Sequence, residues 1–284
     1  MAIFGKVAIL GAGLLGASLA KALKERGLAD SVSVWSRSES TRGKCAKLAD
    51  VFDGVFDTPQ GAVADADLTV LCVPTENIPE LAAKISDSLK DGAILTDVGS
   101  VKSKICAECS KALEGKNAVF VGSHPMAGSE KIGVDYSDSA LFEGRPCFVV
   151  SDDHDSPQTQ AVAKMWNAVG MKICFATPAE HDAIVARVSH LVHLVAGTLC
   201  LVAADYKTDL RRYSGPGFRD TTRVASGSPD IWESIIPDNR GEILAALKEY
   251  RASLDSLISA VETLDKPVIS KRLRDAKAYR DGLK

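Results

Sequence analysis

The chain has 284 residues, more than a typical single domain, which predicts two domains with a full hydrophobic core. It is 46% hydrophobic and 25% charged with a formal net charge of −3, which argues against nucleic acid or an anionic membrane as the main partner. The N-terminal residues show no signal-peptide pattern, and we expect no transmembrane segment. The seven cysteines are an odd number, which fits a reducing compartment. We therefore expect a cytoplasmic protein.

Short apolar segments alternate with helical patterns over the first 175 or so residues, as in parallel βαβ units. The expected strands are residues 6–10, 31–35, 68–73, 93–96, 118–121, 147–150 and 172–175, the last at an edge of the sheet. The helices expected between them are residues 14–27, 38–48, 77–89, 102–113 and 157–169. This alternation predicts an α/β Rossmann-type domain with a parallel sheet over residues 1–175.

The pattern changes near residue 176, after which no strand-like alternation remains. Helices fit residues 178–206, 210–225, 229–235, 240–264 and 266–280. We therefore predict that residues 176–284 form a second, all-helical domain after a short connection.

A glycine motif follows the first expected strand and opens the first helix. Gly11 suits a tight turn, Gly13 lets the backbone approach a pyrophosphate, and Gly16 allows close helix packing. The backbone N–H groups at the helix start, around Leu14 and Leu15, would then hold the pyrophosphate. The motif predicts a dinucleotide site, and a purely structural glycine turn is the alternative.

The end of the second strand bears on the choice between NAD and NADP. An acid at this point would bind the ribose 2′-hydroxyl of NAD, but the sequence places Ser36, Arg37 and Ser38 there. A hydroxyl and a guanidinium suit a 2′-phosphate, and Arg42 could add a second positive charge. These residues favour NADP. The alternative is a polar turn in which Glu39 binds the ribose of NAD.

Further polar residues follow later strands, at the sheet edge where ligands bind. We expect Val73 and Pro74 to turn the chain against the cofactor. Ser100 precedes a helix, where it could face the cofactor, cap the helix, or do both. His124 follows residues 118–121, and a histidine there can transfer a proton near neutral pH. A structural histidine is the alternative, although Ser100, the nucleotide loop and Glu130 should converge on the same crevice.

The helical domain adds a second set of candidates. His190 and His193 are three residues apart and share a helix face. A metal pair is one interpretation, but no third ligand is evident, so we expect no metal and expect one histidine to face the substrate. Arg219 and Arg223 follow a glycine-rich turn and could bind substrate carboxylates through their planar guanidinium groups. Surface ion pairs are the alternative for Arg219 and its neighbour Asp220.

Together these motifs resemble the prephenate/arogenate (cyclohexadienyl) dehydrogenase family of tyrosine biosynthesis, through nearly the whole chain. The resemblance is carried by Gly11-x-Gly13-x-x-Gly16, Asp97-Val98-Gly99-Ser100-Val101-Lys102, His124-Pro125-Met126-Ala127-Gly128-Ser129-Glu130, His181-Asp182, Ser189-His190-x-x-His193 and Gly217-Phe218-Arg219-Asp220-x-Thr222-Arg223. It implies that His124 is a catalytic base for the ring 4-hydroxyl of the substrate, oriented by Ser100. It also implies that Arg223 binds a substrate carboxylate.

The resemblance implies further residues at the substrate pocket: His193 and Arg219 would line it, and Glu130 and Trp232 would help gate it, Trp232 from the partner subunit. It implies a homodimer formed through the helical domain. The implied reaction is an oxidative decarboxylation in which a hydride leaves ring C4, carbon dioxide leaves C1 and the ring becomes aromatic. Such a reaction needs positioning, a base and a cofactor.

Two questions stay open at this point. The residues do not decide between prephenate and arogenate, which differ in a keto or an amino group on the side chain. His193 could donate to the ketone, and Asp182 could accept from the ammonium group or be structural. Two other functions are possible: a different two-domain NADP-dependent hydroxyacid or imine oxidoreductase, and a non-catalytic NADP-sensing protein.

Overall fold

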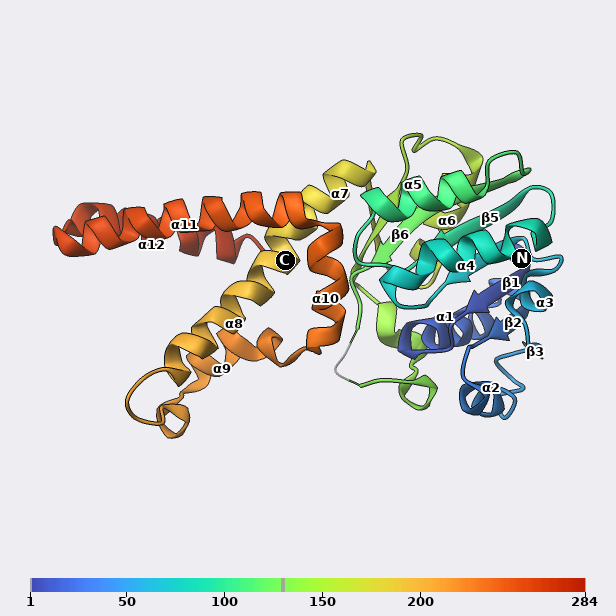
Figure 1. Ribbon diagram of the computed structural model, residues 1–284, viewed down its shortest axis with the longest axis horizontal. Helices are drawn as coiled ribbons and strands as arrows, with labels where there is room; N and C mark the ends of the chain where they lie inside the picture. The colour runs from blue at the N-terminus through green and yellow to red at the C-terminus, as the bar shows by residue number, and fades with distance from the viewer. Residues whose placement is uncertain (1, 129–130, 284) are drawn as a thin grey trace. The chain divides into compact units, whose positions relative to one another are not determined.

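The computed structural model describes residues 2–128 and 131–283 (Figure 1). Contacts divide the chain into two compact units. The sheet unit comprises Met1–Val185 and Ser226–Asn239, and the helical unit comprises Ala186–Ala225 and Arg240–Lys284. The sheet unit therefore extends past the predicted boundary near residue 176, because one helix after the last strand and a later helix pack with the sheet.

In the described part of the chain, the sheet unit holds one eight-stranded sheet in the order β3-β2-β1-β4-β5-β6-β7-β8. The strands are β1 (Phe4–Leu10), β2 (Ala29–Trp35), β3 (Gly54–Phe56), β4 (Leu68–Leu71), β5 (Ala93–Asp97), β6 (Ala118–Pro125), β7 (Pro146–Val150) and β8 (Lys172–Ala176). Strands β1 to β6 are parallel, β7 is antiparallel to β6, and β8 is parallel to β7 at the edge. The sequence patterns therefore predicted all strands except β3, which has only three residues.

The predicted parallel sheet is confirmed except at β7, which runs antiparallel to β6. A parallel strand needs a crossover connection, usually a helix. Between β6 and β7 the described residues form only short 3₁₀ turns, Val134–Tyr136 and Ser139–Phe142. The chain therefore returns alongside β6 in the opposite direction, and β6 extends four residues beyond its predicted end to pair with β7.

Helices cover both faces of the sheet (Figure 1). The helices of the sheet unit are α1 (Leu14–Glu25), α2 (Glu39–Cys45), α3 (Pro59–Val63), α4 (Ile78–Ile85), α5 (Ser103–Ala112), α6 (Pro157–Ala168), α7 (Pro178–Val185) and α10 (Pro229–Asp238). In β1, Val7 and Ile9 enter a buried cluster completed by α1 and α6, whereas Ala8 and Leu10 enter a second cluster completed by α4 and α5. Because successive side chains of the strand point to opposite faces, both faces of the sheet are buried under helices.

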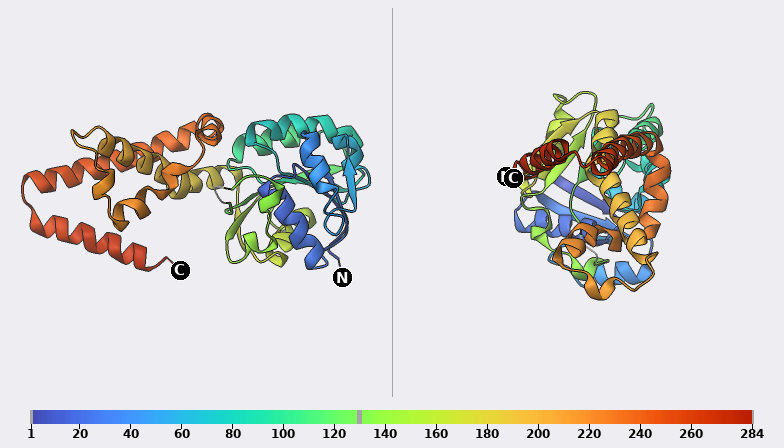
Figure 2. Two further views of the ribbon diagram at one scale, coloured as in Figure 1. Left: turned by 90° about the horizontal axis from the view of Figure 1, so that it is seen from below. Right: turned by 90° about the vertical axis from the view of Figure 1, so that its left-hand side faces the viewer.

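The helical unit confirms the prediction of an all-helical second domain, since its described residues contain no strand. Its elements are a π-helical turn (Ala186–His190), α8 (Leu191–Ala204), 3₁₀ turns at Arg211–Tyr213 and Arg223–Ser226, α9 (Pro216–Thr222), α11 (Arg240–Glu262) and α12 (Lys266–Asp281). Helices α11 and α12 form a hairpin (Figure 2). Arg187 of the π-helical turn forms ion pairs with Glu242 and Glu249 of α11, which tie that turn to the hairpin.

The helical stretch Pro178–Ala204 is long and apolar enough to cross a membrane by length and composition. Its most apolar window has a mean hydropathy of 1.7, and 22% of that window is buried. One helix that passes by length and composition is weak evidence for a membrane span, so the expectation of no transmembrane segment stays a prediction. Val192, Leu201 and Val202 are exposed on this stretch. An apolar face of this kind also suits an interface between subunits.

Candidate active site

The glycine motif joins β1 to α1, and its three glycines meet different constraints. Gly11 has φ +110°, and a Cβ atom on it would lie 2.3 Å from the Cys72 carbonyl oxygen. A Cβ atom on Gly16 would lie 2.1 Å from the Gly11 carbonyl oxygen. A Cβ atom on Gly13 would meet no atom of the described chain within 4 Å. Packing within the chain thus explains Gly11 and Gly16, whereas Gly13 borders open space.

The N-terminus of α1 beside Gly13 suits a phosphate group. Gly13 is the N-cap and provides no side-chain hydrogen bond, and the first turn of α1 contains no acidic residue. The first N–H groups of a helix and its dipole attract anions when no side chain occupies them. Leu14 and Leu15 are half-buried at this turn. The residues present therefore fit the pyrophosphate of a dinucleotide.

The loop after β2 contains the residues that favoured a 2′-phosphate. Ser38 caps α2, since its hydroxyl oxygen accepts the backbone N–H of the residue three positions later at 3.3 Å. Arg42 donates to the carbonyl oxygen of Ser36 at 2.8 Å and pairs with Asp57, so it holds the loop. Arg37 is exposed, and within the described chain its guanidinium has no partner. Arg37 is therefore the cation of this loop that is available to a ligand.

The loops after β4 and β5 lie at the same sheet edge, because parallel strands end there together. Val73 is half-buried and Pro74 begins the short turn that leads into α4. Ser100 is half-buried and lies ahead of α5. The interpretation of Ser100 as the helix cap is wrong, because the Asp182 carboxylate of α7 accepts the backbone N–H groups at the start of α5.

His124 lies within β6, opposite Phe148 of β7, and only 8% of its surface is exposed. The prediction that it follows the strand was wrong, since β6 runs on to Pro125. Its Nδ1 atom lies 2.9 Å from Nε2 of His181. The Nδ1 atom of His181 lies 2.9 Å from Oδ1 of Asp182. The three side chains thus form one hydrogen-bonded chain from α7 to β6.

Burial and hydrogen bonding set the charge states of His181 and Asp182. Burial lowers the pKa of His181, because desolvation penalises the imidazolium more than the bond to Asp182 favours it. Burial would raise the pKa of Asp182, but the hydrogen bonds from His181, Ser103 and Lys102 outweigh it, and the net shift is downward. The pair therefore consists of a neutral imidazole and a carboxylate at neutral pH.

A buried ion pair lies beside this chain. Lys102 and Asp97 are both fully buried, and Nζ of Lys102 lies 2.5 Å from Oδ2 of Asp97. The other carboxylate oxygen of Asp97 accepts the backbone N–H of Ser123 at 3.0 Å. The Ser123 hydroxyl accepts the indole N–H of Trp166 at 3.0 Å. These bonds fix the strand immediately before His124, and losing one charge of such a pair typically costs about 3–5 kcal/mol.

The candidates of the helical unit differ in exposure. His190 is 1% exposed in the π-helical turn, whereas His193 is half-buried in α8. Burial lowers the pKa of His193, and a hydrogen bond with the Val224 backbone opposes this shift. Three or more His, Cys, Asp or Glu side chains arranged to hold a metal ion do not occur among residues 2–128 and 131–283.

Arg219 and Arg223 lie in α9 and in the turn that follows it, and both are exposed. Neither guanidinium has a partner among the described residues, and the alternative of surface ion pairs at Arg219 and Asp220 finds no such pair there. Two arginines without counter-ions suit an anionic ligand.

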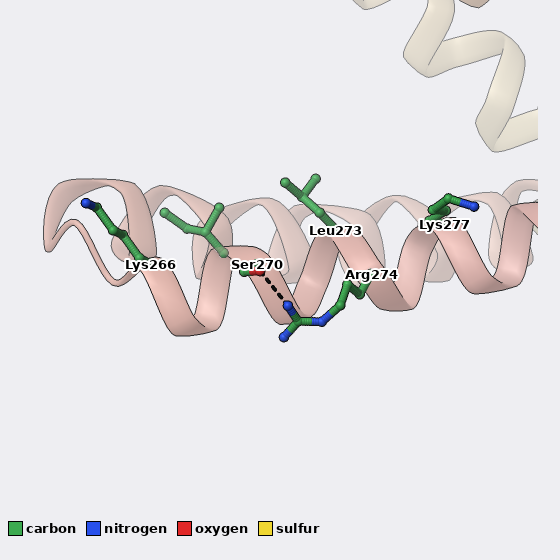
Figure 3. Close-up of a pocket in the computed structure, with 6 residues that line it drawn as sticks. Lys266, Ser270, Leu273, Arg274 and Lys277 are labelled. Carbon is green, nitrogen blue, oxygen red and sulfur yellow. Dashed lines mark hydrogen bonds between the residues drawn. The ribbon is translucent and has the colours of Figure 1, made fainter.

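Two further predicted residues have different outcomes. Glu130 lies outside the described residues. Trp232 of α10 is half-buried against the second core cluster of its own sheet unit, which includes Ile235 of the same helix. Its action from a partner subunit stays a prediction. A separate shallow hollow lies along α12, shown in Figure 3, and none of the candidate residues line it. Its lining residues are Lys266, Ile269, Ser270, Leu273, Arg274 and Lys277.

Comparison with known proteins identifies the family. Residues 19–175 match the family described as "Prephenate dehydrogenase, nucleotide-binding domain", and residues 177–275 match "Prephenate dehydrogenase, dimerization domain". The chain belongs to the prephenate dehydrogenase family. It is 34% identical to cyclohexadienyl dehydrogenase of Zymomonas mobilis over 289 residues, which cover 100% of this chain and 98% of that relative.

Solved structures of this family are also similar. Prephenate dehydrogenase of Aquifex aeolicus, in complex with hydroxyphenyl propionate and NAD+, superposes with a TM-score of 0.89 at 29% identity, covering 99% of this chain and 98% of that one. Arogenate dehydrogenase of Synechocystis superposes with a TM-score of 0.85 at 31% identity, covering 97% and 99%. As a member of the prephenate dehydrogenase family, the chain is an oxidoreductase with a nucleotide-binding domain.

The sequence patterns gave four residues no role beside His124, although one of them contacts it and the others hold its neighbours. His181 and Asp182 were noted as a motif, and Asp182 as a possible substrate ligand, but neither was assigned a role beside His124. Asp97 and Lys102 stand in the same motif as Ser100 and form the buried ion pair. The only available signal was the presence of ionisable residues next to buried strands, where an unpaired charge would be costly.

Proposed function

We propose that this chain is an NADP-dependent dehydrogenase that oxidatively decarboxylates arogenate, prephenate or both, with His124 as the base. The observation that carries the proposal is a nearly buried histidine at the carboxyl end of β6, whose Nδ1 atom is held by a second histidine. Family membership supports the class of reaction. A hydroxyacid or imine oxidoreductase, or a protein that only senses NADP, would leave His124 without a task.

The chemistry follows from this placement. When bound, the nicotinamide cofactor would accept the hydride from ring C4 of the substrate. His124 accepts the proton of the 4-hydroxyl group as charge develops on that oxygen, and returns it to the phenol oxygen once C1 has lost carbon dioxide. The substrate becomes aromatic in the same step, so the protein supplies positioning and one proton acceptor. Ser100, at the same sheet edge, would orient the 4-hydroxyl group and the nicotinamide.

Substrate recognition is assigned to the helical unit. Arg223 would bind a substrate carboxylate, and Arg219, His193 and His190 would contribute to the pocket. The support is the exposure of both arginines without counter-ions in the described chain. Asp182 is buried, and its carboxylate already accepts hydrogen bonds from other groups of the chain. It is therefore disfavoured as the ligand of a substrate ammonium group.

The test is NADPH formation, followed by absorbance, with prephenate and with arogenate as separate substrates. Turnover of at least one substrate is expected. Absence of turnover with both would refute the proposed function. The same assay with NAD and NADP gives the cofactor preference. NADP is supported by Arg37, whose guanidinium has no partner among the described residues, and by the lack of an acid at the end of β2. A higher kcat/KM with NAD would contradict this part of the proposal.

We also infer that the enzyme is a cytoplasmic homodimer formed through the helical unit. The support is the match to a dimerization domain and the exposed apolar side chains of α8 and α11, including Leu201, Val202, Ile258 and Val261. Covering such a face removes apolar area from water, which stabilises by about 25 cal/mol per Å². Light scattering after size-exclusion chromatography should give twice the mass of 30.1 kDa. A monomer at micromolar concentration would contradict the inference.

A further inference from the structure

The hydrogen-bonded chain that ends on His124 determines which of its nitrogens can take a proton. We propose that His181, itself fixed by Asp182, is a positioning residue that holds His124 as the Nδ1–H tautomer, in which the lone pair of the ring is on Nε2. This inference rests on the proposed function for its catalytic meaning. The tautomers themselves can be measured without any substrate or cofactor.

The argument starts at Asp182, whose carboxylate can only accept hydrogen bonds. Its Oδ2 atom accepts the backbone N–H of Ser103 at 2.8 Å. Its Oδ1 atom accepts the backbone N–H of Lys102 at 2.8 Å and lies 2.9 Å from Nδ1 of His181. Three donors on one carboxylate stabilise its ionised form. Nδ1 of His181 must therefore carry a hydrogen.

The next step concerns the second nitrogen of His181. A doubly protonated imidazolium is disfavoured, because the ring is fully buried, packs edge-on against Phe148 with 5.0 Å between ring centroids, and has the Lys102 ammonium nearby. The charged and titratable groups that act on it are Asp182, His124, Lys102 and Asp97. A neutral ring with hydrogen on Nδ1 has its lone pair on Nε2.

That lone pair fixes His124. Nδ1 of His124 lies 2.9 Å from Nε2 of His181, which can only accept, so Nδ1 of His124 is the donor. The lone pair of His124 is then on Nε2, the nitrogen at the far side of the ring from His181. When Nε2 takes a proton, the positive charge on the ring strengthens the bond to His181, and the Asp182 carboxylate supports it. The same logic of an oriented base operates in Ser-His-Asp triads.

The first test is a measurement of imidazole ¹⁵N chemical shifts by NMR near pH 7.5. The chain has only five histidines, so the signals can be assigned with single variants. We expect both His124 and His181 as Nδ1–H tautomers. An Nε2–H tautomer for His124 would overturn the proposal, whatever the activity of the protein.

The second test compares His181→Gln with His181→Asn. A Gln amide reaches the position of Nε2 and can accept from His124, whereas an Asn amide reaches only the position of Nδ1 and retains the donor to Asp182. We expect kcat to fall by about 10² or more in the Asn variant, with recovery of much of this loss in the Gln variant. The substrate KM and cofactor affinity should stay within about twofold. The acidic limb of the kcat/KM profile should move to lower pH in the Asn variant.

His154→Gln is the matched control, because His154 lies outside this hydrogen-bonded chain, and it should retain wild-type kcat and pH profile. Equal losses in the Asn and Gln variants, or an unchanged kcat in the Asn variant, would overturn the positioning role. If the wild-type protein turns over neither substrate, the proposed function fails, while the NMR result still decides the tautomers.

Discussion

The two units of this chain treat their polar groups in opposite ways. In the sheet unit, charged side chains such as Lys102, Asp97 and Asp182 are buried and each has a partner. In the helical unit, Arg219 and Arg223 are exposed and have no partner in the described chain, and large apolar side chains face solvent. The buried charges of the sheet unit are thus paired within the chain, and its openings for a ligand are the exposed Arg37 and the turn at Gly13. The helical unit carries surfaces that only a ligand or a second subunit would complete.

The largest expected effect concerns the base in the sheet unit. His124→Asn should lower kcat by roughly 10²–10⁴, the range for loss of a general base, with little change in cofactor affinity. Steady-state kinetics and cofactor titration measure the two quantities. A turnover near that of the wild-type protein would show that His124 of the sheet unit is not the base. The contrast between a catalytic sheet unit and a substrate-binding helical unit would then fail.

The arginines of the helical unit should affect binding rather than turnover. Arg223→Ala should chiefly raise the substrate KM, since an unpaired substrate charge costs about 2–5 kcal/mol. Arg251→Ala, on the exposed surface of α11, is the matched control and should leave KM unchanged. An unchanged KM in the Arg223 variant would show that this arginine does not bind the carboxylate.

Two glycines of the glycine motif are expected to serve different purposes, Gly16 the packing of the sheet unit and Gly13 the binding of the cofactor. Gly16→Ala should destabilise the protein by about 1–3 kcal/mol, because the new methyl group would collide with the Gly11 carbonyl. Gly13→Ala should leave stability nearly unchanged and weaken cofactor binding, because its methyl group enters open space. Denaturant unfolding and cofactor titration test the pair. Equal stability losses in both variants would contradict this division.

The smallest expected effect is on how the free energy of unfolding depends on pH. The pKa of His181 is lowered by burial, so the unfolded chain binds its proton at higher pH than the folded chain does. Its stabilising contribution is therefore complete above the ordinary pKa of about 6.5 and is lost as pH falls below it, by at most about 1.4 kcal/mol per pH unit. The pKa of the half-buried His193 is also lowered, so it acts in the same direction.

Unfolding in denaturant at pH 7.5 and 5.5 measures this dependence. His181→Gln should reduce the loss of stability on acidification more than His193→Gln does, because His181 is the more deeply buried. A larger effect of His193→Gln would show that burial disfavours the charged form more strongly for the histidine of the helical unit than for His181 of the sheet unit.

Much of the fold could be predicted from local patterns. The glycine motif, most strand positions and the helices after residue 176 depend on periodicity and turn residues, which are local. The reversal of β7 could not be predicted, because residues 126–145 give no local signal for or against a crossover helix. Strand β3 is too short to show an alternation.

The site was predictable in its parts and not in its connections. His124 was singled out by its place after an apolar segment, although β6 extends through it. The contact between His124 and His181 joins residues 57 positions apart, and the capping of α5 by Asp182 joins residues about 80 apart. Such pairings depend on tertiary packing, which a single sequence does not display.

The tryptophans have a consequence for spectroscopy. All three, Trp35, Trp166 and Trp232, belong to the sheet unit, whereas the helical unit contains tyrosines and Phe218 but no tryptophan. Trp166 is fully buried against Ser123, beside the strand of His124, and Trp35 ends β2 near the loop of Arg37. Tryptophan emission therefore reports on the sheet unit alone, while far-ultraviolet circular dichroism has a large contribution from the helical unit. Recording both signals during one melt would show whether the two units unfold together.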